Sequence, residues 1–272
     1  MSTPNPFAAP EPWDLVAEGY AAEGTAITRP VARAAAALVR PGRSAHVVDV
    51  AAGPGPLALE LAPEVASVTA VDFAEAMNAQ LRAAAQARSL GNIRVVHGDG
   101  QALPLPDAVF DAGFSLFGWM FFPDRARGLA ELARVLRPGA PLVVSSWAPL
   151  SRSPLMAAMF GALHAADHSF HVPVYNPQSL ENPEQLEREL LAAGFQSTAV
   201  HAHTVTLEFE SVEALWTRMV RSSAPLVSMR RRLGEDVWAA RGAIALSHLR
   251  RELGERPGRQ STTAWLGYGI RP

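Results

Sequence analysis

Residues 45–61 read AHVVDVAAGPGPLALEL, and this stretch decides the fold. It begins as a short apolar run rich in valine, breaks at Gly53-Pro54-Gly55, and resumes with leucines at helical spacing. A short apolar run with β-branched residues is typical of a buried strand, and glycines at its end allow a tight turn into a helix. The stretch therefore predicts a strand, a glycine-rich turn and a helix in direct succession.

The same alternation continues toward the carboxyl terminus. Apolar runs predict strands at 67–72, 93–97, 109–116 and 141–147, and helical spacing predicts helices at 74–88 and after Asp124. Asn182-Pro183 opens a further helix that ends at Gly194. Strands follow at 196–209 and 262–270, with a mostly helical piece at 211–253 between them. Strands that alternate with helices predict an α/β fold with a mostly parallel sheet.

The length and composition favour one domain. The 272 residues, 49% of them hydrophobic, suffice for one substantial core. We expect a Pro-rich, mobile amino terminus at 1–12 and a single domain at 13–272. Helical segments at 13–23 and 30–40 precede the first strand and are expected to form an amino-terminal lid at 13–44. Insertions at 149–181 and 211–258 are expected to cap the site.

The composition also excludes several classes of function. The formal net charge is -2, and all 24 basic residues are arginines, so no overall positive field would attract nucleic acid or an anionic membrane. The chain has no Cys, which excludes a disulfide scaffold, a thiolate metal site and a Cys nucleophile. It has no apolar run of about 18 residues and no signal-peptide pattern. We therefore expect a cytoplasmic protein.

The glycine loop admits two cofactors. Gly53-x-Gly55-x-x-Ala58 with Asp72 19 residues after Gly53 matches a dinucleotide-binding fingerprint, which would indicate an NAD-dependent oxidoreductase. Asp49 lies within the first strand, where a dinucleotide site would have apolar residues and where a carboxylate could orient the loop or meet a ligand ammonium. S-adenosylmethionine (SAM) carries that ammonium, and NAD does not. The polar turn at 98–104 also has no dinucleotide role, so the residues favour SAM.

Four stretches together resemble the class I SAM-dependent methyltransferases, in the branch similar to the ubiquinone and menaquinone biosynthesis methyltransferases. They are VVDVAAGPG (47–55), AVDFAEAM (70–77), GDGQALPLPDAVFD (98–111) and MFFPDRARGLAELARVLRPGAPLVVSSW (120–147). The resemblance implies a Rossmann-like, seven-stranded, mostly parallel sheet with helices on both faces, an antiparallel last strand and a helical cap. It also implies transfer of a methyl group from SAM, which leaves S-adenosylhomocysteine.

Carried over position by position, the resemblance implies a complete set of cofactor contacts. The methionine part of SAM would lie against residues 51–55, the ribose would bind Asp72, and the adenine would lie between Phe73 and Met77. Gly100 departs from the pattern, because the family usually has Ala there. The implied cofactor-binding residues are Tyr20, Asp49, Ala51, Gly53, Gly55, Asp72, Phe73, Met77, Asp99, Gly100, Gln101 and Ser115.

Large apolar residues suggest the nature of the acceptor. We expect an acceptor pocket lined by Phe117, Trp119, Trp147, Trp216 and Met219, although aromatic and Met residues at helical spacing are also common in cores. Such a pocket favours a small hydrophobic acceptor, a quinone or secondary metabolite, methylated on O, N or C by in-line displacement. A SAM-binding protein of the same fold without methyl transfer is the alternative.

Three histidines crowd an otherwise apolar segment. His164, His168 and His171 are candidates for a general base, with surface or packing roles as the alternative. Their spacing would place three imidazoles on one helical face, but residues 169–173 predict an extended chain that removes the third ligand. We therefore expect no metal cofactor.

Overall fold

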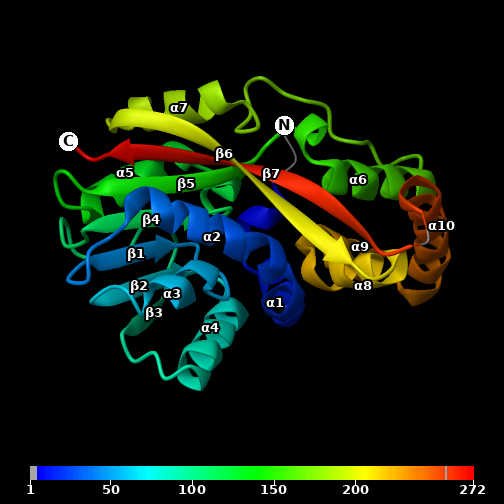
Figure 1. Cartoon of the computed structure of the whole chain (residues 1–272), viewed down its shortest axis with the longest axis horizontal. Coiled ribbons are helices and arrows are strands. Elements are labelled where there is room, and N and C mark those ends of the chain that lie inside the picture. The colour runs from blue at the N-terminus through cyan, green and yellow to red at the C-terminus, as the bar shows by residue number, and fades with distance from the viewer. Residues whose placement is uncertain (1–4, 255) are drawn as a thin grey trace.

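The computed structural model describes residues 5–254 and 256–272, and its centre is a seven-stranded sheet with the order β3-β2-β1-β4-β5-β7-β6 (Figure 1). All neighbouring pairs are parallel except those of β7, which runs antiparallel to β5 and β6. The predicted sheet, including its antiparallel last strand, is confirmed. The strands are β1 (His46–Val50), β2 (Ser67–Asp72), β3 (Ile93–His97), β4 (Ala112–Leu116), β5 (Pro141–Trp147), β6 (Gln196–Phe209) and β7 (Gly258–Ile270).

Helices cover both faces of the sheet. Successive residues of a strand point to opposite faces, so Val47 packs under α2 (Thr25–Val39), α3 (Pro56–Leu61) and α4 (Glu75–Ala87). Val48, on the other face, packs with α5 (Arg125–Val135) and α7 (Pro183–Ala192). Each face is buried by its own apolar cluster, as a parallel sheet requires.

The amino-terminal helices differ from the prediction. They form one nearly continuous stretch: α1 (Glu11–Gly19), a π-helical segment η2 (Tyr20–Gly24) and α2. Pro30 lies inside α2 and does not open it. Val31, Ala32 and Ala35 are completely buried against the sheet, and this burial outweighs the backbone hydrogen bond that proline removes.

The remaining helices form a cap near the end of β6 and the start of β7 (Figure 1). They are α6 (Pro154–Ala166), α8 (Val212–Ser222), α9 (Ala224–Leu233) and α10 (Glu235–Leu253), which share a third apolar cluster. Arg241 of α10 pairs with Asp167 just after α6 at 2.5 Å, so the two insertions expected from the sequence pack on each other. Among the residues described, no helix has the length and apolar character needed to cross a membrane.

The segment expected to be mobile, 1–12, falls partly outside the described residues, which begin at Asn5. The rest of it is packed. Phe7, in the short 3-10 helix η1 (Pro6–Ala8), has its ring centroid 6.1 Å from that of Trp13 and 5.9 Å from that of Phe121. Phe121 belongs to η3 (Trp119–Phe121), between β4 and α5, so this terminus contacts the sheet domain.

Candidate cofactor and acceptor site

A cavity lies at the carboxyl ends of β1 and β4, where the strand order changes direction. Its volume is about 270 Å³. Open α/β sheets bind ligands at such a switch point. Ala51 and Phe117 directly follow these two strands, and both adopt left-handed backbone conformations, with φ of 56° and 59°. Strained non-glycine residues of this kind cluster at functional sites, because the turn they make determines what faces the ligand.

Two glycines near the cavity, Gly55 and Gly118, leave no room for a side chain. A Cβ at Gly55, where φ is +78°, would lie 2.2 Å from Leu81 of α4. A Cβ at Gly118 would lie 2.2 Å from the Cβ of Ala51, so the loops after β1 and β4 touch each other. Backbone atoms therefore form much of this wall, as close approach of a ligand requires.

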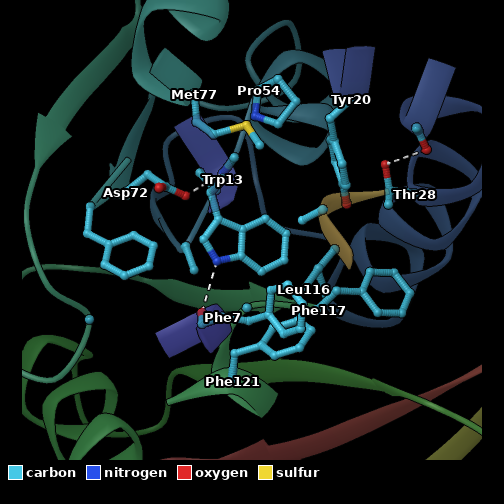
Figure 2. A pocket seen from close by; sticks show the side chains of 18 of the residues that line it. Phe7, Trp13, Tyr20, Thr28, Pro54, Asp72, Met77, Leu116, Phe117 and Phe121 are labelled. Carbon is cyan, nitrogen blue, oxygen red and sulfur yellow. Dashed lines mark hydrogen bonds between the residues drawn. The ribbon is translucent and has the colours of Figure 1, made fainter. Parts of the chain in front are cut away.

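Asp72 joins the end of β2 to the glycine loop and lines the cavity (Figure 2). One of its carboxylate oxygens accepts a hydrogen bond from the Gly53 N–H at 2.8 Å, and the other accepts one from the Ala74 N–H at 2.9 Å. Burial raises the pKa of Asp72 to about 6, although these two hydrogen bonds oppose the rise. A carboxylate has further lone pairs, so Asp72 can also accept hydrogen bonds from a ligand.

Asp49 lies beneath the loop and does not line the cavity. Only 2% of its surface is exposed, and its Oδ2 has no hydrogen-bond partner within the described part of the chain. Burial, followed by the nearby Asp72 carboxylate, raises the pKa of Asp49 to about 8. Asp49 therefore lies behind the loop in this structure, and its expected role, to orient the loop or to meet a ligand ammonium, stays a prediction.

We expect Asp49→Asn to stabilise the ligand-free protein increasingly as the pH rises from 5 to 8.5. The Asp49 carboxyl has a pKa of 3.8 in the unfolded chain and about 8 in the folded protein, so it binds its proton more tightly in the native state. The free energy of unfolding of the wild type therefore falls as the pH rises from 3.8 toward 8. The variant lacks this loss, which should amount to a few kcal/mol and several degrees in Tm. Thermal unfolding across this pH range is the measurement, and a Tm difference that does not vary with pH would contradict the assignment.

Phe73, Met77, Asp99, Gly100 and Gln101 line one end of the cavity, where the resemblance places the adenine. The Asp99 carboxylate accepts a hydrogen bond from the Gln101 N–H at 2.8 Å, so that N–H is not free for a ring nitrogen in this conformation. A Cβ at Gly100 would lie 2.3 Å from the ring of Phe122. Phe122 thus explains why this chain has Gly where the family pattern has Ala.

Ser115 holds the turn after β4 and does not reach the cavity. It is completely buried, and its hydroxyl accepts a hydrogen bond from the Trp119 N–H at 3.2 Å. Ser145 of β5 similarly accepts one from the Phe117 N–H at 2.9 Å. The Ser115 hydroxyl is thus engaged in the turn after β4, and its expected contact with the cofactor stays a prediction.

Phe117 and Trp147 line the other end of the cavity and stack at 4.0 Å between ring centroids. Two of the predicted pocket residues lie elsewhere. Trp119 is completely buried and donates its indole N–H to the Arg125 carbonyl at 2.9 Å, and Trp216 stacks on Trp238 inside the cap. We group the following six cavity-lining residues and call them the acceptor wall, after the role proposed for them below: Ile27, Phe117, Trp147, Met156, Met219 and Ser222.

Two residues that line the cavity, Phe7 and Trp13, were not among the predicted site residues. Trp13 lies in the middle of the cavity, with Met77 and Asp72 on one side and Phe117 and Phe121 on the other (Figure 2). Its indole N–H donates to the Phe7 carbonyl at 2.9 Å. An isolated phenylalanine in a Pro-rich terminus is the feature that could have indicated Phe7.

Comparisons with known proteins show which proteins this chain resembles. Residues 47–139 match a family described as a methyltransferase domain. The chain is 37% identical over 182 residues to a demethylmenaquinone methyltransferase of Deinococcus radiodurans, which covers 61% of this chain and 73% of that protein. It is 30% identical over 238 residues to the nocamycin O-methyltransferase of Saccharothrix syringae, which covers 81% of this chain and 85% of that protein.

The chain belongs to the class I SAM-dependent methyltransferases. Within them it falls in the ubiquinone and menaquinone branch, and it is therefore an enzyme that uses SAM. The YcgJ protein of Bacillus subtilis has the same fold, with a TM-score of 0.55 and 20% identity over 88% of this chain and 97% of that chain. This membership decides against the NAD-dependent oxidoreductase.

The three histidines lie outside the methyltransferase cavity. His164 is exposed near the end of α6, its Nδ1 lies 2.7 Å from the Phe170 carbonyl, and its ring centroid is 5.3 Å from that of His168. His168 and His171 are also exposed, and none of the three lines the cavity. The described residues contain no group of three possible metal ligands.

We expect the triple variant His164→Ala, His168→Ala, His171→Ala to retain kcat/KM within about twofold at pH 7. A general base contributes about 100-fold or more, so its loss would be unmistakable. Methylated product measured by mass over a pH series is the readout. A roughly 100-fold loss of kcat/KM would return these histidines to the active site.

Proposed function

We propose that this methyltransferase transfers its methyl group to a small, hydrophobic acceptor of the quinone or secondary-metabolite type. The observation that carries the proposal is the acceptor wall, which combines the Phe117 and Trp147 stack with Met156 and Met219 and has no charged side chain. Flat aromatic surfaces and polarisable thioethers favour a planar, lipophilic ligand. The names of the two relatives, which act on demethylmenaquinone and nocamycin, support the same class of acceptor.

The other end of the cavity fits the cofactor. Asp72 offers lone pairs to ribose hydroxyls, the residues after β1 present backbone to the methionine part, and Phe73 with Met77 offers apolar contact to the adenine. SAM supplies a methyl group already activated as a sulfonium. The chain then has to align acceptor and methyl group and to exclude water, which is the purpose we assign to the apolar wall.

A product screen tests the proposal. The enzyme is incubated with methyl-labelled SAM and a panel of lipophilic phenols, quinols and amines, with carboxylate-bearing analogues of the same ring systems as matched controls. We expect label in the lipophilic members that lack a carboxylate and at least tenfold less in their carboxylate-bearing analogues. Label in the carboxylates alone would refute the class of acceptor, and SAM binding without product from any member would favour the SAM-binding alternative.

A further inference from the structure

Ionisable side chains are distributed unevenly around the cavity. Among the described residues that line it, the acids are Asp72, Asp99 and the phenol Tyr20, and there is no His, Glu or Arg. Asp72 and Asp99 lie at the cofactor end. The acceptor wall has Ser222 as its polar member, and that hydroxyl donates to the Arg218 carbonyl at 2.9 Å.

None of these groups is suited to remove a proton from an acceptor. Asp72 lies at the cofactor end, where its remaining lone pairs are assigned to the ribose hydroxyls, and the Asp99 carboxylate accepts the Gln101 N–H at the adenine end. Burial raises the pKa of Tyr20 to about 12, so its phenol stays protonated at neutral pH and does not act as a base.

Charged groups just outside the cavity are engaged elsewhere. Asp49 lies beneath the loop, and Asp14 accepts a hydrogen bond from the Ala76 N–H. His97 lies near Glu75, at 3.6 Å. Behind the acceptor wall, Glu23 pairs with Arg218 at 3.4 Å and Arg221 at 3.7 Å. Among the residues that the structure describes, none on the acceptor wall can therefore serve as a general base.

We propose that the enzyme selects an acceptor that arrives already ionised: a phenol or enol acidic enough to be an oxyanion at neutral pH, on an otherwise uncharged, lipophilic skeleton. This inference rests on the proposed function and narrows it to O-methylation. An oxygen lone pair forms the new bond to the methyl carbon while the carbon–sulfur bond breaks, and the electron pair of that bond stays on sulfur. No proton moves in this step, so no base is needed.

The same geometry disfavours the other acceptor atoms. An aliphatic amine is protonated at neutral pH and would need a base before it could attack. Attack by an aromatic ring carbon leaves a ring proton that must be removed afterwards, again by a base. An ionised oxygen has neither requirement.

Charge decides where the anion can reside. An isolated anion in an apolar cavity pays a large desolvation penalty, whereas an anion next to a cation in a medium of low dielectric is strongly attracted to it. The acceptor wall offers no cation, so the attraction has to come from the sulfonium at the cofactor end. Acceptor anions should therefore bind well to the cofactor-loaded enzyme and poorly to the enzyme that holds the neutral product.

A coloured acceptor analogue tests this by binding alone. The probe is a lipophilic 4-nitrophenol, whose phenolate absorbs at about 400 nm. Its pKa is measured by pH titration while it is bound to two complexes of the wild-type enzyme. One complex holds S-adenosylhomocysteine, and the other holds a SAM analogue with an ammonium in place of the sulfonium. We expect the pKa of the bound nitrophenol to fall by about one unit in the cationic complex and to rise in the neutral one. Equal pKa values in the two complexes would overturn the proposal.

Matched variants of the acceptor wall give an independent reading. Met219 is 8% exposed and lines the cavity, so Met219→Glu adds a carboxylate there while Met219→Gln adds similar bulk without charge. If the acceptor binds as an anion, Met219→Glu should weaken nitrophenolate binding at least about tenfold more than Met219→Gln. If the acceptor binds neutral, the two variants should bind it alike, and Met219→Glu should accelerate weakly acidic phenols by serving as the missing base. The second outcome refutes the inference.

Failure of this inference can be told from failure of the proposed function. Nitrophenol that binds neither complex, together with no product from the wider panel, rejects the hydrophobic acceptor itself. Product formed equally well from phenols of pKa about 5 and about 10 at pH 7 keeps the proposed function and rejects the preionised acceptor. Thermal unfolding of each Met219 variant confirms that the comparison is made on folded protein.

Discussion

Asp72→Ala is expected to weaken SAM binding by about 1.5 to 3 kcal/mol, which corresponds to a roughly 10- to 150-fold rise in Kd. The substitution removes the acceptor for the ribose hydroxyls and also frees the Gly53 N–H, which Asp72 holds at 2.8 Å. Hydrogen bonds to an ionised carboxylate are about twice as strong as neutral ones, so Asp72→Asn should fall between the wild type and Asp72→Ala. Calorimetric titration with SAM and with S-adenosylhomocysteine gives both values.

The control and the pH dependence sharpen this test. Asp236→Ala removes an exposed carboxylate of the cap and should leave the Kd for SAM unchanged. Because the pKa of Asp72 is raised to about 6, the wild type should bind SAM more weakly as the pH falls from 7 to 5, while Asp72→Asn should lose this dependence. A wild-type Kd that Asp72→Ala leaves unaltered would show that this carboxylate only shapes the loop.

The sequence predicted the cofactor end of the site well because its signals are local. The glycine loop, Asp72 and the turn at 98–104 each follow a strand directly, and parallel strands bring their carboxyl ends to one edge of the sheet. Ala51, Gly53, Asp72, Phe73 and Met77 therefore meet at the cavity, as expected. Their roles in binding stay predictions.

The acceptor end could not be predicted in the same way. The side chains that follow β4 are aimed by the left-handed conformation of Phe117, which turns Phe117 toward the cavity and Trp119 into the core. No residue pattern in the sequence indicates that backbone conformation. Trp216 and Met219 lie three positions apart on α8, yet Met219 lines the cavity while Trp216 stacks on Trp238. That difference depends on how the cap helices pack on one another, and these contacts join segments that are far apart in the sequence.

The amino-terminal segment is tied to both ends of the site. Asp14 of α1 accepts a hydrogen bond from the Ala76 N–H at 2.9 Å, at the start of the helix that carries Met77. On its other side the segment touches α8, where a Cβ at Gly19 would lie 1.9 Å from the Arg221 carbonyl oxygen. Tyr20, which lines the cavity, begins the π-helical turn between these anchors. Such turns are frequent at functional sites, and here the turn would let the lid close on both ligands.

Deleting residues 1–20 is therefore expected to raise the Kd for SAM at least about tenfold and to lower turnover further, while the sheet stays folded. The deletion removes Phe7, Trp13 and Tyr20 from the cavity wall, but no strand lies in the part of that stretch that the structure describes, 5–20. Trp13→Ala should reproduce part of the loss, whereas Leu15→Ala, which truncates a side chain that is 44% exposed, should not. Hydrogen exchange supplies the direct measurement, since a lid that closes on SAM must gain protection over residues 13–20 when SAM binds. Equal protection with and without SAM, together with full activity of the truncated enzyme, would mean that these residues are only a fixed wall of the domain and take no part in admitting or holding the ligands.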